Sequence, residues 1–63
     1  MTKAELRRAR ERLGMTQLEL AEALGMQRNT IVRMENGSHA IMRTTELAIK
    51  YLLLAMRKKG GRK

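Results

Sequence analysis

The segment from Thr16 to Gly37 constrains the fold of this chain most, because each half carries the signals of a short helix. Thr16 and Glu19 have the spacing of a capping box, in which each side chain accepts from the other residue's backbone N–H at a helix N-terminus. Gly25 follows one helical segment later, and glycine ends helices in the left-handed conformation at no steric cost. Three apolar residues between them, Leu20, Ala21 and Leu24, fall on one helical face.

A second helical period follows this glycine and ends at Asn36-Gly37. Ile31 and Met34 are three residues apart and predict its buried face. Because Ala21 is small, the two helices can approach closely at a steep crossing. The segment therefore predicts a helix-turn-helix motif, whose second helix enters the major groove of DNA.

The residues of this motif resemble the lambda-repressor-like helix-turn-helix family, the phage repressor, Cro and XRE type. The shared pattern is Gln17, Glu19-Leu20-Ala21, Leu24-Gly25, Ile31 and Met34-Glu35-Asn36-Gly37. A preceding helix from Leu6 to Leu13 extends the resemblance toward the N-terminus. The resemblance implies an all-α fold, a compact four-helix domain with a central helix-turn-helix.

The composition independently favours a small helical domain. Ala, Leu, Met, Glu and Arg dominate the 63 residues, and Pro is absent. There is no Cys, so neither a disulfide nor a thiolate metal site can stabilise the fold. Helix packing must therefore stabilise a chain close to the lower size limit for independent folding, with a partner chain as a further source of stability.

Two more helices are expected on either side of the motif. Thr2 and Glu5 repeat the capping-box spacing, so the first helix should begin at Thr2 and end before Gly14. Thr44 is the expected N-cap of a last helix over about residues 45–58.

The positive charge is concentrated at the C-terminus. The net charge is +8, but without the last five basic residues nine basic residues face six glutamates, a charge of +3. We expect residues 1–58 to form the DNA-binding domain and residues 59–63 to form a flexible basic tail. Both suit a polyanionic partner such as double-stranded DNA, although a basic tail can also be merely solvated. The five residues are Arg57, Lys58, Lys59, Arg62 and Lys63.

The second helix of the motif carries polar side chains suited to reading DNA. Since Ile31 and Met34 face inward, residues 28, 29 and 33 must project away from the core. Arg can donate to both acceptors of guanine, and Asn or Gln matches the acceptor and donor of adenine. The alternative is an ordinary solvated helix face. The resemblance implies base contacts by Gln27, Arg28, Asn29 and Arg33.

Further DNA contacts are expected around this helix. The resemblance implies that Gln17 donates to a phosphate at the start of the preceding helix. It also implies that Asn36 holds a phosphate, unless Asn36-Gly37 is simply a C-cap turn. Thr30 is expected at a thymine methyl or a phosphate, and Arg43 at the minor groove.

Arg10 and Glu35 are interpreted differently, as structural residues. Arg10 lies between Leu6 and Leu13 on the inward face of the first helix, where an unpaired charge would be costly. The resemblance implies a partly buried ion pair with Glu35 that braces the first helix against the third.

The last helix is more apolar than one buried face requires, since every residue from Leu47 to Met56 except Lys50 is apolar. Leu47, Tyr51, Leu54, Ala48 and Ala55 cluster on one side, and the resemblance implies that this side packs against the helix-turn-helix. The other side should form a homodimer interface, because an exposed patch of this kind is a liability on a small monomer. The alternative is that the whole helix is core. The expected interface residues are Ile49, Leu52, Leu53 and Met56.

Catalysis is not expected. His39 is the only histidine and there is no Cys or Asp, so neither a catalytic triad nor a metal cluster can be assembled. No cofactor is suggested by the remaining residues. The longest apolar run, Tyr51–Met56, is too short to span a bilayer, and no secretory signal is visible.

We therefore expect a sequence-specific DNA-binding transcriptional regulator, a repressor or autoregulator of phage, mobile-element or bacterial origin. It should bind an inverted-repeat operator as a homodimer and act in the cytoplasm, at the bacterial nucleoid or in a phage-infected host. One alternative is an antitoxin-like protein whose main role is to bind a protein partner. Another is a non-specific architectural DNA binder.

Overall fold

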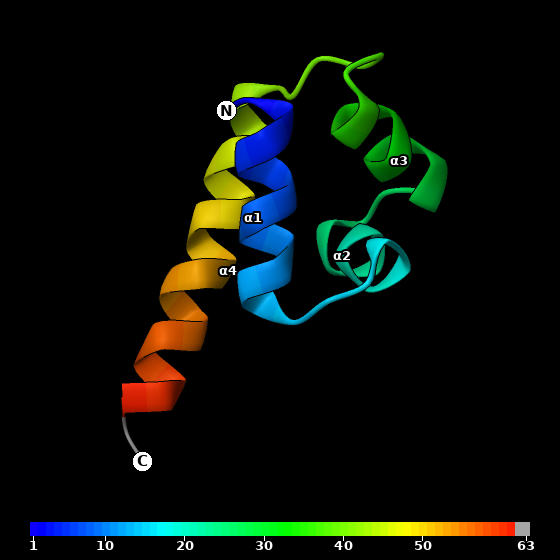
Figure 1. The fold of residues 1–63 in the computed structure, drawn as a ribbon. Helices are drawn as coiled ribbons and strands as arrows, with labels where there is room; N and C mark the ends of the chain where they lie inside the picture. Colours follow the sequence, from blue (N-terminus) through cyan, green and yellow to red (C-terminus); the bar gives the residue numbers. More distant parts are fainter. Residues whose placement is uncertain (62–63) are drawn as a thin grey trace.

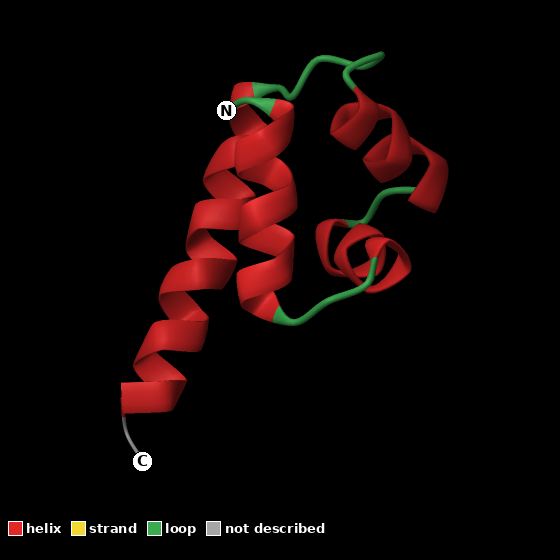
Figure 2. Ribbon diagram, in the orientation of Figure 1, coloured by secondary structure: helices red, strands yellow, loops and turns green. Residues whose placement is uncertain are grey.

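The structure, a computed structural model, describes the backbone of residues 1–61 and the side chains of residues 1–56. Within these bounds it contains helices and no strand (Figure 1, Figure 2). This confirms the predicted all-α architecture with a central helix-turn-helix. The helices are α1 (Lys3–Leu13), α2 (Gln17–Leu24), α3 (Arg28–Asn36) and α4 (Arg43–Gly61).

Both predicted capping boxes are present. The backbone N–H of Glu5 donates to Thr2 Oγ1 at 3.1 Å, and the N–H of Thr2 donates to Glu5 Oε1 at 2.7 Å. Thr16 and Glu19 make the equivalent pair of bonds, at 3.1 and 2.8 Å. The starts of α1 and α2 are therefore determined by local side-chain chemistry.

Gly25 forms the turn between α2 and α3. Its φ is 71°, in the left-handed region, and its N–H donates to carbonyls of the last turn of α2. A Cβ built on Gly25 would meet nothing within 4 Å. The need for glycine here is thus conformational rather than steric.

The core forms where all four helices meet. Helices α2 and α3 pack against each other, and α1 packs against both α3 and α4. Ala21 is fully buried, as the predicted close crossing of α2 and α3 requires. The predicted inward positions of Leu20, Ile31 and Met34 are confirmed. The buried apolar residues are Leu6, Ala9, Leu20, Ala21, Ile31, Met34 and Ile49.

The predicted start of the last helix was wrong. Helix α4 begins at Arg43, and the carbonyl of Met42 accepts the N–H of Glu46 at 3.0 Å. Thr44 therefore lies inside the helix and is not its N-cap. Helix α4 extends to Gly61, so the predicted tail at 59–63 begins inside this helix, while residues 62 and 63 lie outside the described part of the chain.

The predicted faces of α4 were also wrong. Ile49 is fully buried, Leu52 and Leu53 pack against the core, and Met56 is half-buried. The side expected to be core is instead largely exposed: Leu47 by 53%, Tyr51 by 69% and Leu54 by 55%. Because α4 is apolar on both sides, its pattern alone does not determine which side meets α1 and α2. The four residues predicted at a dimer interface, Ile49, Leu52, Leu53 and Met56, therefore belong wholly or partly to the domain's own interior.

In the described part of the chain, no helix combines the length and the apolar character that crossing a bilayer demands.

Replacing Gly25 should test the turn of the motif. Gly25→Ala should lower the free energy of unfolding by about 1–2 kcal/mol, because a Cβ disfavours the left-handed conformation. Gly25→Asn should cost less, since asparagine tolerates this region better. Urea denaturation followed by circular dichroism measures both. Equal stability of Gly25→Ala and the parent protein would contradict the assigned conformation.

Candidate nucleic-acid interface

The outer face of α3 carries the predicted base-reading residues. Ile31 and Met34 are buried on the opposite face and fix how the helix is turned. Gln27 is the N-cap, but its side chain makes no capping hydrogen bond, so its amide is not engaged there. The structure thus leaves four polar side chains of this segment open to solvent. Gln27, Arg28, Asn29 and Arg33 are exposed, and Thr30 is half-buried beside them.

The single acidic residue of α3, Glu35, is paired inside the protein. Arg10 Nε donates to Glu35 Oε2 at 2.6 Å, and Arg10 Nη2 donates to Oε1 at 3.3 Å. The two side chains are only 16% and 4% exposed. The structure therefore contains the ion pair predicted between α1 and α3, and the exposed charges of α3 are basic.

Arg10 also contacts the connection between α1 and α2. Its Nη1 donates to the carbonyl of Met15 at 3.0 Å. One guanidinium therefore joins α1, the turn before α2 and, through Glu35, α3. The sequence did not predict the bond from Arg10 to Met15. Every residue has a backbone carbonyl, so the residue type does not show which carbonyl accepts the bond.

Gln17 has an internal partner that sequence reasoning also missed. Its Nε2 donates to Glu35 Oε1 at 3.2 Å, which links the start of α2 to α3. A carboxylate has about four lone-pair sites, and Arg10 uses two of those on Glu35. The acceptor capacity left on Glu35 was the available signal. An amide has two N–H donors, so the predicted phosphate contact of Gln17 requires the second one.

Asn36 forms the turn after α3. Its Oδ1 accepts from the N–H of Ser38 at 2.9 Å and from Ser38 Oγ at 2.6 Å. Gly37 follows with a left-handed φ of 89°. The structure thus contains the C-cap turn that the sequence left open, and a phosphate contact by Asn36 stays a prediction.

Arg43 is separated from this group of residues. It is exposed at the start of α4, and the first turn of α4 lies beside the N-terminus of α1 (Figure 1). An ion pair of 3.4 Å between the Met1 amino group and Glu46 joins these two segments. A minor-groove contact by Arg43 would therefore lie apart from the contacts made by α3, and it stays a prediction.

The helix-turn-helix fold agrees with a comparison to known families. A helix-turn-helix family model of the XRE or lambda-repressor-like type matches residues 6–48, from within α1 to the first part of α4. The chain belongs to this family, which consists of DNA-binding regulatory domains and is not typically enzymatic. Neither a curated protein nor a solved structure matches the chain. The protein is thus a DNA-binding regulator of the XRE type.

Removing Arg10 should test the role of the internal ion pair. Arg10→Met should lower the free energy of unfolding by about 3 kcal/mol, because Glu35 would keep a buried charge without its cation. The double variant Arg10→Met/Glu35→Gln should be more stable than this single variant, since no charge is then left unpaired while Gln17 keeps an amide partner. Urea denaturation of the three proteins compares them. If Arg10→Met lowered the free energy of unfolding by less than about 1 kcal/mol, the ion pair of Arg10 and Glu35 would not have the structural role assigned to it.

Proposed function

We propose that this protein is a sequence-specific transcriptional regulator, a repressor or autoregulator that occupies a promoter and is not an enzyme. Its operator is an inverted repeat in double-stranded DNA, with half-site centres about one helical turn, roughly 34 Å, apart. The observation that carries this proposal is the orientation of α3. Arg28, Asn29 and Arg33 point away from the core, and buried Ile31 and Met34 prevent the helix from turning.

The chemistry of α3 supports base reading in the major groove. Arg28 and Arg33 can each donate two bonds to guanine O6 and N7, and Asn29 or Gln27 can pair with adenine N6 and N7. Thr30 can contact a thymine methyl or a phosphate. Because Glu35 is already neutralised by Arg10, no unpaired carboxylate of α3 opposes the DNA phosphates.

Contacts to the DNA backbone would come from residues around α3. We assign phosphate contacts to Gln17 and Asn36, and a minor-groove contact to Arg43. Phosphate contacts position the protein on the duplex without reading sequence. The basic residues at the C-terminal end add attraction for any duplex and raise the dependence of affinity on salt.

A homodimer would match the symmetry of an inverted repeat. The exposed face of α4 supports this assembly, because Leu47, Tyr51 and Leu54 are spaced i, i+4 and i+7 and form one stripe along the helix. Small Ala48 and Ala55 flank the stripe and allow a second helix to approach. Three such side chains supply less than the roughly 800 Å² per partner of a stable interface. We therefore expect weak association that the operator promotes.

The proposed site of action follows from the DNA target. A regulator of this type acts in the cytoplasm, at the bacterial nucleoid or in a phage-infected host. Selecting bound duplexes from random DNA tests the proposal, and an enriched inverted repeat is the expected result. Equal recovery of all sequences would instead indicate a non-specific architectural binder.

Arg28 provides a residue-level test of DNA reading. Arg28→Ala should cost about 1–3 kcal/mol of binding free energy at the selected operator and relax the preference at one base pair. Arg12→Ala is the matched control, since it removes an exposed arginine of α1 and should weaken all duplexes alike. Competition binding with single-base operator variants measures both effects. If Arg28→Ala left both the affinity for the operator and the base preference unchanged, Arg28 would not be a base-reading residue.

Tyr51 provides the test of the dimer. Tyr51→Glu should leave the domain folded, because this side chain lies outside the core, but should weaken operator binding at least about tenfold, or 1.4 kcal/mol. Ala4→Glu makes the same change of charge on an exposed position of α1 and should have little effect. Sedimentation of the protein–operator complex gives the number of chains bound. A single chain on the full operator would contradict the dimer.

A further inference from the structure

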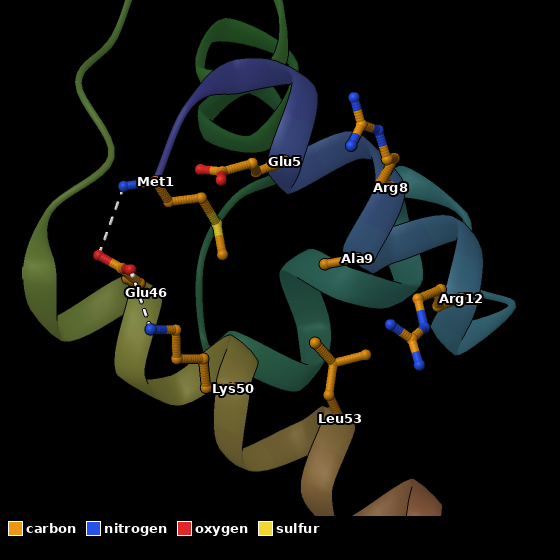
Figure 3. A pocket seen from close by; sticks show the side chains of 8 residues that line it. All are labelled: Met1, Glu5, Arg8, Ala9, Arg12, Glu46, Lys50 and Leu53. Carbon is orange, nitrogen blue, oxygen red and sulfur yellow. Dashed lines mark hydrogen bonds and ion pairs between the residues drawn. The ribbon is translucent and has the colours of Figure 1, made fainter.

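A groove runs between α1 and α4, on a surface that the DNA-reading residues do not use (Figure 3). One part of it is a hollow of about 320 Å³ with Met1, Ala9 and Leu53 among its apolar lining. A second hollow of about 280 Å³ shares Arg12, Lys50 and Leu53 with the first. Its remaining lining residue, Leu54, belongs to the exposed stripe of α4 assigned above to the dimer and is not part of the site proposed below. We call this elongated feature the α1–α4 groove.

The walls of the α1–α4 groove are basic. Arg8 and Arg12 lie one turn apart on α1, and Lys50 lies opposite them on α4 (Figure 3). Among the described side chains, neither Arg8 nor Arg12 takes part in an ion pair. Their charges are therefore available to a ligand.

The acidic groups of the groove already have partners. Glu5 accepts the N–H of Thr2 in the capping box. Glu46 lies 3.3 Å from Lys50 Nζ and 3.4 Å from the Met1 amino group. The hydrogen bond from Lys50 and the positive charge of Met1 hold the pKa of Glu46 below its usual range. Glu46 is thus kept ionised by neighbours of its own chain. Among the described side chains, Arg8, Arg12 and Glu5 line the hollow without an ion pair, so its unpaired charges are two cations and one carboxylate, and the excess is positive.

The α1–α4 groove also lies apart from α3. Helix α1 stands between α4 and α3 (Figure 1), and Arg10 points from α1 toward Glu35 of α3. Arg8 and Arg12 lie on the other flank of α1 and line the same hollow as Lys50 of α4. A ligand in the groove would therefore leave the outer face of α3 free for DNA.

We propose that the α1–α4 groove binds an acidic amphipathic helix of a partner protein. Apolar residues spaced i, i+3 and i+4 on that helix would contact Ala9 and Leu53, and its carboxylates would pair with Arg8 and Arg12. The apolar lining favours a protein helix over a DNA backbone, which has no apolar stripe to bury. A second copy is a poorer occupant of a basic groove, because this chain itself carries a net charge of +8.

Two synthetic peptides of identical composition test this proposal on the full chain. One arranges Leu, Ala and Glu as an amphipathic helix, and the other has the same residues in scrambled order. Fluorescence anisotropy of the labelled peptides should show at least about tenfold tighter binding of the amphipathic peptide. Its affinity should be unchanged when the protein is saturated with its operator duplex. Equal binding of the two peptides, or displacement by the duplex, would overturn the proposal.

Charge reversal on each flank of α1 then locates the binding surface. Arg8→Glu/Arg12→Glu should weaken the amphipathic peptide about tenfold more than Lys3→Glu/Arg7→Glu, which changes the net charge equally but on residues outside the groove. Circular dichroism establishes that both variants are folded. An equal loss in both would show general electrostatic attraction and overturn the proposal. The peptide measurements with free protein need no operator, so their outcome is separate from that of the DNA-binding proposal.

Discussion

The carboxylate of Glu35 is the point at which three helices of this domain are joined. It accepts two hydrogen bonds from Arg10 of α1, at 2.6 and 3.3 Å, and one from Gln17 of α2, at 3.2 Å. Arg10 in turn donates to the carbonyl of Met15. In a domain without disulfides, this network supplies the directional contacts that apolar packing lacks. The orientation of α3 depends on it together with buried Ile31 and Met34.

In this arrangement the acidic and basic side chains of α3 have different roles. Its carboxylate is turned inward and neutralised, while Arg28 and Arg33 face outward. The same separation recurs on α1, where Arg10 is internal and Arg8 and Arg12 are exposed beside the α1–α4 groove. The two exposed basic surfaces differ in their surroundings. Polar Asn29 and Gln27 accompany the first, which suits bases, and apolar Leu53 accompanies the second, which suits a protein helix.

The parts of the fold that depend on local chemistry could be predicted from the sequence. These parts are the capping boxes at Thr2 and Thr16 and the left-handed turn at Gly25. Each involves residues only a few positions apart, so the local sequence contains everything needed to predict it. The faces of α4 were assigned the wrong way round, because both sides are apolar and only packing against α1 and α2 decides between them. The bond from Gln17 to Glu35 depends on tertiary placement, and only the unused acceptor capacity of the Glu35 carboxylate pointed to it.

Reading of guanine and adenine edges by α3 in the major groove can be tested by methylation interference on the selected operator. Methylation of guanine N7 places a methyl group in the major groove, where Arg28 and Arg33 are expected to donate. Such methylation should block binding in two half-sites about one helical turn apart, if α3 reads these edges. Full binding to duplexes methylated at every guanine of both half-sites would contradict it.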